Sequence, residues 1–192
     1  MLVKNIMITS AEFLDLKNVV KYLNGDIEES EELLEESNNL LLAVNMVNNS
    51  IASSYIELLA SKKIMVNTDI VSYSDISEKS IIEIKNVLNG FSQKVGYKIL
   101  PEGLSLSSKG EMCIEYSYFP DKVSIESDIN YYLKLNEMTF AIGVVAEYLY
   151  IKGAIDDAYL WDKRFKNSMF NLLRPKRNIV LPARRWWLYV LF

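Results

Sequence analysis

The residues best suited to specific chemical contacts are the cations and tryptophans of the last segment, residues 174–192. Guanidinium groups bind carboxylates in pairs of hydrogen bonds, and tryptophan side chains serve as buried anchors in protein interfaces. Pro175 and Pro182 prevent one helix from running through the segment, so its apolar groups need another surface to cover them. We expect an extended arm that binds a partner protein; alternatively, the segment folds back over its own core. The expected binding residues are Arg174, Lys176, Arg177, Arg184, Arg185, Trp186 and Trp187.

A second charged segment has the opposite sign. Residues 26–36 hold seven acidic side chains and no basic one, whereas residues 163–185 hold eight basic side chains and no acidic one. We expect the acidic segment to face solvent or a channel; alternatively, it is a solvated helix face that complements the positive end of its helix. A calcium loop is disfavoured because the spacing differs from that of such loops. The acidic residues are Asp26, Glu28, Glu29, Glu31, Glu32, Glu35 and Glu36.

Composition argues against most kinds of enzyme. The chain has no histidine, which excludes histidine-based triads, histidine general bases and histidine metal ligands. Its one cysteine, Cys113, cannot form an internal disulfide or a cysteine-cluster zinc site, and the alternating pattern around it predicts a small buried side chain. No phosphate-binding glycine loop or nucleophile-elbow motif occurs. We therefore expect a protein without catalytic activity, bound metal or cofactor.

The apolar pattern predicts an α+β fold, mainly α, in which a bundle of about four helices carries an inserted β meander. Leucine, valine and aromatic stripes at helical spacing predict four helices, and Thr9 with Glu12 has the spacing of a capping box. Gly25 and Gly153 are stop signals, so the last two helices should form an antiparallel hairpin. Gly143 is small enough to let a neighbouring helix approach closely. The expected helices span residues 9–24, 28–60, 127–152 and 154–173.

Between the second and third helices the apolar period changes to that of strands. Short β-branched runs, interrupted by turn signals such as Asn89-Gly90 and Pro101-Glu-Gly103, predict a small antiparallel meander over residues 63–119. We expect a single domain over residues 1–173, followed by the arm at 174–192. Within it, Trp161 should be a core anchor.

Several stretches together resemble a known group of proteins. They are Ile114-Glu-Tyr-Ser-Tyr-Phe-Pro120, Ala141-Ile-Gly-Val-Val-Ala-Glu-Tyr148, Ala158-Tyr-Leu-Trp-Asp-Lys-Arg-Phe165 and Arg184-Arg-Trp186. In this order, the chain resembles the head-to-tail connector (adaptor) proteins of tailed double-stranded DNA bacteriophages. The resemblance spans about residues 110–187 and is architectural before that; Leu188–Phe192 extends beyond it.

The resemblance implies a structural protein of the virion, made in the host cytoplasm and not associated with a membrane. Connectors of this kind form a homo-oligomeric ring, typically of twelve copies, at the head–tail interface. The helices form the ring wall, the C-terminal arm docks on the portal protein, and the opposite side receives a downstream tail protein. Double-stranded DNA passes through the channel without sequence-specific binding, which an acidic subunit favours because it gives the phosphates few cations to bind.

Two other interpretations remain open, and a third, an enzyme that uses carboxylates or Mg²⁺, has no positive feature in the sequence. A nucleic-acid-binding protein could use the basic, tryptophan-rich arm to contact phosphates and stack bases. A membrane-surface protein could place the same tryptophans among lipid headgroups. The net charge of −4 argues against the first, and the shortness of the segment against the second.

Overall fold

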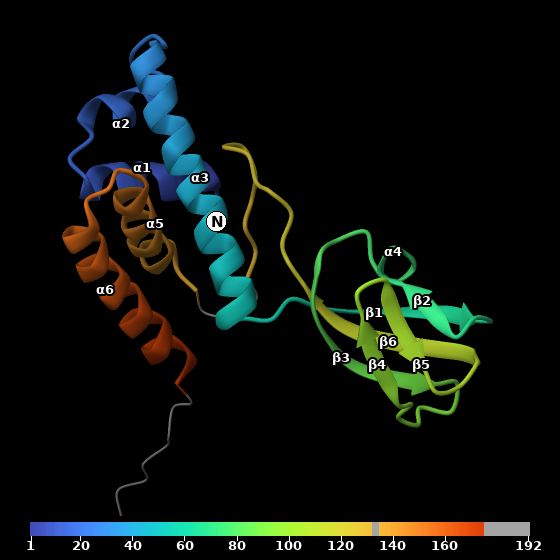
Figure 1. Ribbon diagram of the computed structural model, residues 1–192. Helices are drawn as coiled ribbons and strands as arrows, with labels where there is room; N and C mark the ends of the chain where they lie inside the picture. Colours follow the sequence, from blue (N-terminus) through green and yellow to red (C-terminus); the bar gives the residue numbers. More distant parts are fainter. Residues whose placement is uncertain (132–134, 175–192) are drawn as a thin grey trace, which may run out of the picture.

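The structure, a computed structural model, describes residues 1–131 and 135–174. Figure 1 shows a body of helices beside a separate group of strands, hereafter the helical body (residues 1–54, 119–131 and 135–174) and the β module (residues 59–118). The fold is α+β. In chain order the elements are α1 (Val3–Phe13), α2 (Lys17–Asn24), α3 (Glu31–Ser54), β1 (Leu59–Val66), β2 (Ile70–Ser72), α4 (Tyr73–Ile76), β3 (Ile81–Asn89), β4 (Tyr97–Leu100), β5 (Gly103–Leu106), β6 (Gly110–Tyr118), α5 (Glu137–Ile151) and α6 (Ile155–Leu173).

The core of the helical body lies where α5 packs against α1, α3 and α6 (Figure 1). Phe140 of α5 is fully buried there, together with Ile6 of α1 and Leu40 of α3. The predicted close approach at Gly143 is confirmed: a Cβ on this residue would lie 3.0 Å from the Phe165 ring. Helices α5 and α6 form the predicted antiparallel hairpin, and Gly153 adopts the left-handed conformation (φ +77°) at its turn.

The predicted four-helix bundle is wrong. The first predicted helix, 9–24, is two helices, because the chain turns at Asp15 (φ +54°) between α1 and α2. Thr9 lies inside α1 and donates a hydrogen bond to the Glu137 carboxylate (3.3 Å), so it belongs to no capping box. Gly25 does end α2 in the left-handed conformation, as predicted.

Two other predicted helices are shorter than expected. The helix predicted over 28–60 begins at Glu31, after the Ser30 hydroxyl accepts a bond from the Leu33 amide, and ends at Ser54. The helix predicted over 127–152 begins at Glu137, capped by Asn136. In the described part of the preceding segment the backbone pairs with the N-terminus instead of forming a helix: the Val3 amide donates to the Ser127 carbonyl (3.0 Å), and the Ile129 amide donates to the Met1 carbonyl (2.9 Å). The last helix, predicted over 154–173, spans Ile155–Leu173.

The β module contains the predicted strands but not the predicted meander. It has two antiparallel three-stranded sheets, with strand orders β1-β6-β3 and β2-β5-β4. Strand β6 is the centre of the first sheet because it pairs with both β1 and β3, which are distant from it in sequence. Alternating apolar residues predict which face of a strand is buried but not which strand becomes its neighbour.

The two parts have separate cores. Ile114 of β6, Leu104 of β5 and Ile76 of α4 are buried in the β module, in a cluster that shares none of its described residues with the core of the helical body. The chain enters and leaves the module at one point, where the Tyr118 amide donates to the Leu58 carbonyl (3.1 Å). We call this crossing, formed by residues 55–58 and by Tyr118 at the end of the module, the neck.

Candidate functional site

The acidic segment forms the loop between α2 and α3 and the first turns of α3. Six of its seven acidic side chains are exposed, and the seventh, Glu36, is half-buried. Glu31 and Glu32 lie in the first turn of α3, where a negative charge complements the positive end of the helix. Part of the acidity is thus explained by helix formation alone. Glu29 accepts a hydrogen bond from the Tyr22 hydroxyl (3.1 Å), and Asp26, Glu28 and Glu35 are exposed to solvent or a partner.

Glu36 does not face solvent in the manner predicted for the acidic segment. Its carboxylate accepts hydrogen bonds from the Tyr148 hydroxyl and from the Lys152 ammonium (2.8 Å), both presented by the end of α5. Burial alone would raise the pKa of the Glu36 carboxyl, but these bonds outweigh it and hold the pKa below its ordinary value. Burial, and then the neighbouring carboxylate, raise the pKa of the Tyr148 phenol. Glu36 therefore ties α3 to α5.

Only the first residue of the predicted binding arm lies within the described part of the chain. Arg174 is exposed at the end of α6, and its extended backbone (φ −62°, ψ 123°) ends the helix. The other predicted arm residues lie outside the described residues: Lys176, Arg177, Arg184, Arg185, Trp186 and Trp187.

Helix α6 presents a surface that the sequence analysis did not identify. Its buried stripe is formed by Ala158, Phe165 and Met169, as predicted. The side left uncovered by this stripe, hereafter the α6 outer face, carries large apolar side chains that are 58–64% exposed, together with two exposed cations. The same helical periodicity could have revealed it, since these positions fall outside the buried stripe. The face comprises Ile155, Tyr159, Leu160, Lys163, Lys166 and Phe170.

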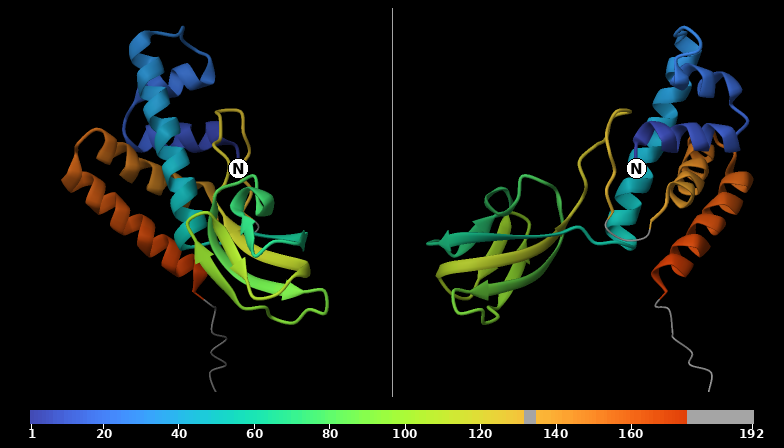
Figure 2. Two further views of the ribbon diagram at one scale, coloured as in Figure 1. Left: turned by 45° about the vertical axis from the view of Figure 1, so that its right-hand side comes forward. Right: turned by 180° about the vertical axis from the view of Figure 1, so that it is seen from behind.

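Helix α3 has a comparable face of opposite charge. Leu42 and Met46 are 51% and 40% exposed on the side of α3 that faces away from the core. Toward the N-terminus, Glu31 and Glu35 continue the same stripe and are also exposed. We call this stripe the α3 outer face; Figure 1 and the right view of Figure 2 place α5 between α3 and α6.

Trp161 lies at the edge of α6 and is half-buried instead of being the predicted core anchor. Its ring contacts Phe13 of α1, with 5.4 Å between ring centroids, and the Arg164 guanidinium lies 5.0 Å from the ring centre. The pair joins α6 to α1 at the periphery of the helical body and leaves the centre of the core to Phe165.

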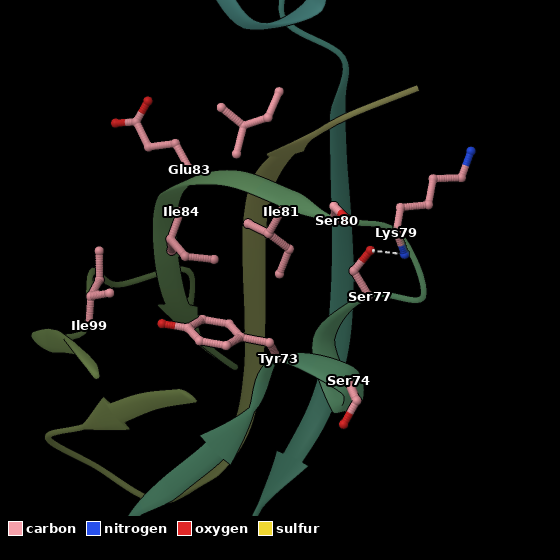
Figure 3. A pocket seen from close by; sticks show the side chains of 10 residues that line it. Tyr73, Ser74, Ser77, Lys79, Ser80, Ile81, Glu83, Ile84 and Ile99 are labelled. Atoms are coloured by element: carbon pink, nitrogen blue, oxygen red, sulfur yellow. Dashed lines mark hydrogen bonds between the residues drawn. The ribbon is translucent and has the colours of Figure 1, made fainter. Parts of the chain in front are cut away.

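The β module contains an open pocket of about 320 Å³ beside β3 and α4 (Figure 3). Its apolar lining includes Tyr73, Ile81, Ile84 and Ile99, and the Tyr73 hydroxyl donates to the Leu100 carbonyl (2.7 Å). The two charged lining residues already have partners outside the pocket, since Lys79 pairs with Asp121 and Glu83 pairs with Lys85, both at 2.6 Å. The pocket can hold an apolar side chain, and it brings together no general acid and base.

Cys113 is half-buried on β6, so it is less buried than predicted.

Within residues 1–131 and 135–174, no three metal-binding side chains of the histidine, cysteine or acidic types are grouped. None of the helices in the same ranges combines the length and the apolarity that a bilayer crossing needs. The features best suited to function are therefore the outer faces of α3 and α6, which present apolar and charged side chains to a protein surface.

The sequence matches no protein-family model, and no curated protein is significantly similar to it.

Proposed function

We propose that the protein is a head-to-tail connector of a tailed double-stranded DNA bacteriophage. Its copies assemble into a ring, typically of twelve, between the portal protein and a downstream tail protein, and the ring surrounds the passage for DNA. The protein acts in the virion as a structural component without a catalytic role or cofactor, after synthesis in the host cytoplasm.

The observation that carries the proposal is the pair of outer faces on α3 and α6. A subunit in a ring needs two different surfaces, one for each neighbour, because the contact that closes a ring is heterologous. The helical body exposes apolar side chains on two helices, one face bordered by Glu31 and Glu35, the other by Lys163 and Lys166. Exposed apolar groups bordered by charge are typical of protein-binding surfaces.

The resemblance to connectors adds support from the sequence. Its three stretches within the described residues lie on β6 and its exit, on α5 and on α6, which are the centre of the first sheet and the helical hairpin. The fourth, Arg184–Trp186, belongs to the arm, to which we assign docking on the portal. Arg174 begins the arm from the exposed end of α6, where it continues the positive charge of that helix.

The test is native mass spectrometry of the full chain, alone and mixed with candidate portal rings. We expect a closed oligomer, or a subunit that joins a portal ring in fixed stoichiometry. The double variant Arg184→Glu/Arg185→Glu should lose portal binding while its circular dichroism spectrum is unchanged. A monomer or dimer that ignores portal rings, but is retained on DNA with a steep salt dependence or on anionic vesicles, would overturn the proposal in favour of the nucleic-acid or membrane interpretation.

A further inference from the structure

The outer faces of α3 and α6 match in spacing as well as in charge. On α6, Tyr159 follows Ile155 by four residues, and Lys166 follows Tyr159 by seven. On α3, Leu42 precedes Met46 by four residues, and Glu35 precedes Leu42 by seven. Steps of four and seven residues keep three side chains on one side of a helix, separated by about 6 and 10 Å along its axis.

The two series run in opposite directions along the chain. From the N-terminal end of α6 the order is apolar, apolar, basic; from the C-terminal end of α3 it is apolar, apolar, acidic. If the two helices lie antiparallel, Ile155 meets Met46, Tyr159 meets Leu42 and Lys166 meets Glu35. All six side chains are exposed in the single subunit: the four apolar ones between 40% and 64%, Lys166 at 62%, and Glu35 in the exposed class.

These faces do not cover each other within one molecule, because all six side chains are exposed in it. We propose that the α6 outer face of one copy binds the α3 outer face of a second copy, antiparallel and in this register. The inference deepens the ring proposed above and rests on it. The occupant is a second copy because apolar and charged positions match at the same spacing on two faces of one chain.

Local charges favour the same pairing. Lys163 adds a second positive charge to the α6 outer face, one turn before Lys166, and Glu31 adds a second negative charge to the α3 outer face, one turn before Glu35. Lys166 bonds Asp162 in its own helix (2.6 Å), but its side chain is 62% exposed, whereas that of Asp162 is 22% exposed, so the ammonium can also meet a partner carboxylate. Two positive or two negative side chains placed opposite each other would weaken the interface, because like charges repel each other.

Charge reversal at the two ends of the proposed ion pair provides the test, with full-length protein analysed by native mass spectrometry and light scattering. Glu35→Lys places two cations face to face at every contact, and Lys166→Glu places two anions there. Each variant should therefore weaken self-association about tenfold or more relative to the wild type. Glu12→Lys on α1 and Lys62→Glu on β1 change the same charges at exposed positions away from both faces, and should assemble as the wild type does.

Mixing the two variants gives the decisive measurement. In an alternating arrangement, every contact pairs a Glu35→Lys face with a Lys166→Glu face, or an unchanged Glu35 with an unchanged Lys166. Oligomers should therefore re-form only in the mixture and contain equal numbers of the two variants. If the wild type assembles and both single variants assemble equally well, the interface is wrong while the ring stands. If the wild type forms no oligomer alone or on portal rings, both the proposed ring and the proposed interface are wrong.

Discussion

The helical body and the β module differ in which segments of the chain supply the residues of their cores. The helical core joins α1 and α3 from the first part of the chain to α5 and α6 from the last, across an insertion of more than sixty residues. The core of the β module comes from one continuous stretch. Contacts between distant segments form only after a long loop has closed, whereas the module can bury its own apolar surface locally. The two cores should thus respond separately to mutation.

The largest effect should come from Gly103→Ala in the β module. A Cβ on this residue would overlap the backbone carbonyl of Val71, so β2 and β5 cannot stay paired as they are. We expect a loss of about 3 kcal/mol in the stability of the module. Hydrogen exchange read by mass spectrometry should accelerate in residues 59–118 and remain unchanged in α5 and α6. Gly90→Ala, whose nearest contact would be 3.8 Å, is the matched control; equal acceleration in both parts would mean one shared unfolding unit.

The converse substitution is Gly143→Val in the helical body. Its Cβ would lie 3.0 Å from the Phe165 ring and 3.1 Å from a Val47 methyl group, in a core without free space. Overpacking of this kind should cost about 2 kcal/mol. Exchange should accelerate in α3, α5 and α6 while β1, β3 and β6 keep their protection. Faster exchange throughout the β module would show that its fold depends on the helical body.

A smaller effect should follow from loosening the segment that returns from the neck. The Asn45 amide donates to the carbonyls of Leu41 (2.9 Å) and Val123 (3.2 Å), and its oxygen accepts from the Val123 amide (2.8 Å). Asn45→Ala removes these bonds and should lower the stability of the helical body by about 1–2 kcal/mol. Asn49→Ala, at an exposed position one turn further along α3, should change it little. Identical melting temperatures for the two variants would contradict this role for Asn45.

The smallest expected effects depend on pH and involve two carboxylates of the helical body. The pKa of Glu36 is lowered in the folded protein. Its contribution to folding stability is therefore present above the ordinary carboxyl pKa of 4.5, and it is lost as the pH falls through the pKa of the folded state. Burial, and then repulsion by Asp162, raise the pKa of Glu147, so its ionised form opposes folding at neutral pH. At pH 7, Glu36→Gln should lower stability by about 1 kcal/mol, and Glu147→Gln should raise the melting temperature by about 1 °C.

Thermal melts of both variants from pH 7 to pH 3 would check these signs. The Glu36→Gln deficit should shrink toward acid pH, where the wild-type carboxylate is also neutral, and the Glu147→Gln advantage should shrink as well. A Glu36→Gln deficit that stays constant with pH would mean that shape, and not charge, matters at this position.

Elements with local signals were predicted well from the sequence. Helix α6 was predicted within one residue of its start, and the strand at Ile81–Asn89 was recognised by its β-branched content. Local signals failed where a distant partner decides the structure. A helix was predicted from residue 127, yet the backbone of residues 125–129 pairs with the N-terminal residues 1–4, and Asn48 of α3 binds the Tyr131 hydroxyl. Nothing in residues 119–131 alone reveals these contacts.

The candidate site was predicted in a similarly uneven way. The charge asymmetry of the chain was visible, and the exposed part of the acidic segment follows from it. The role of Glu36 was missed because Tyr148 and Lys152 lie more than one hundred residues away. The α6 outer face was missed for another reason: apolar residues at helical spacing predict the buried stripe of α6, and Tyr159 and Phe170 lie outside that stripe.

The neck has a consequence for how the gene can change. Leu58 and Tyr118 are joined by a hydrogen bond, so the fifty-nine residues between them begin and end at one place on the helical body. A duplication, deletion or exchange of the coding sequence for residues 59–117 would leave the ends of α3 and of the returning segment close enough to be rejoined by a short linker. The outer faces of α3 and α6 lie outside residues 59–117, so such a change in the gene would leave their residues in place.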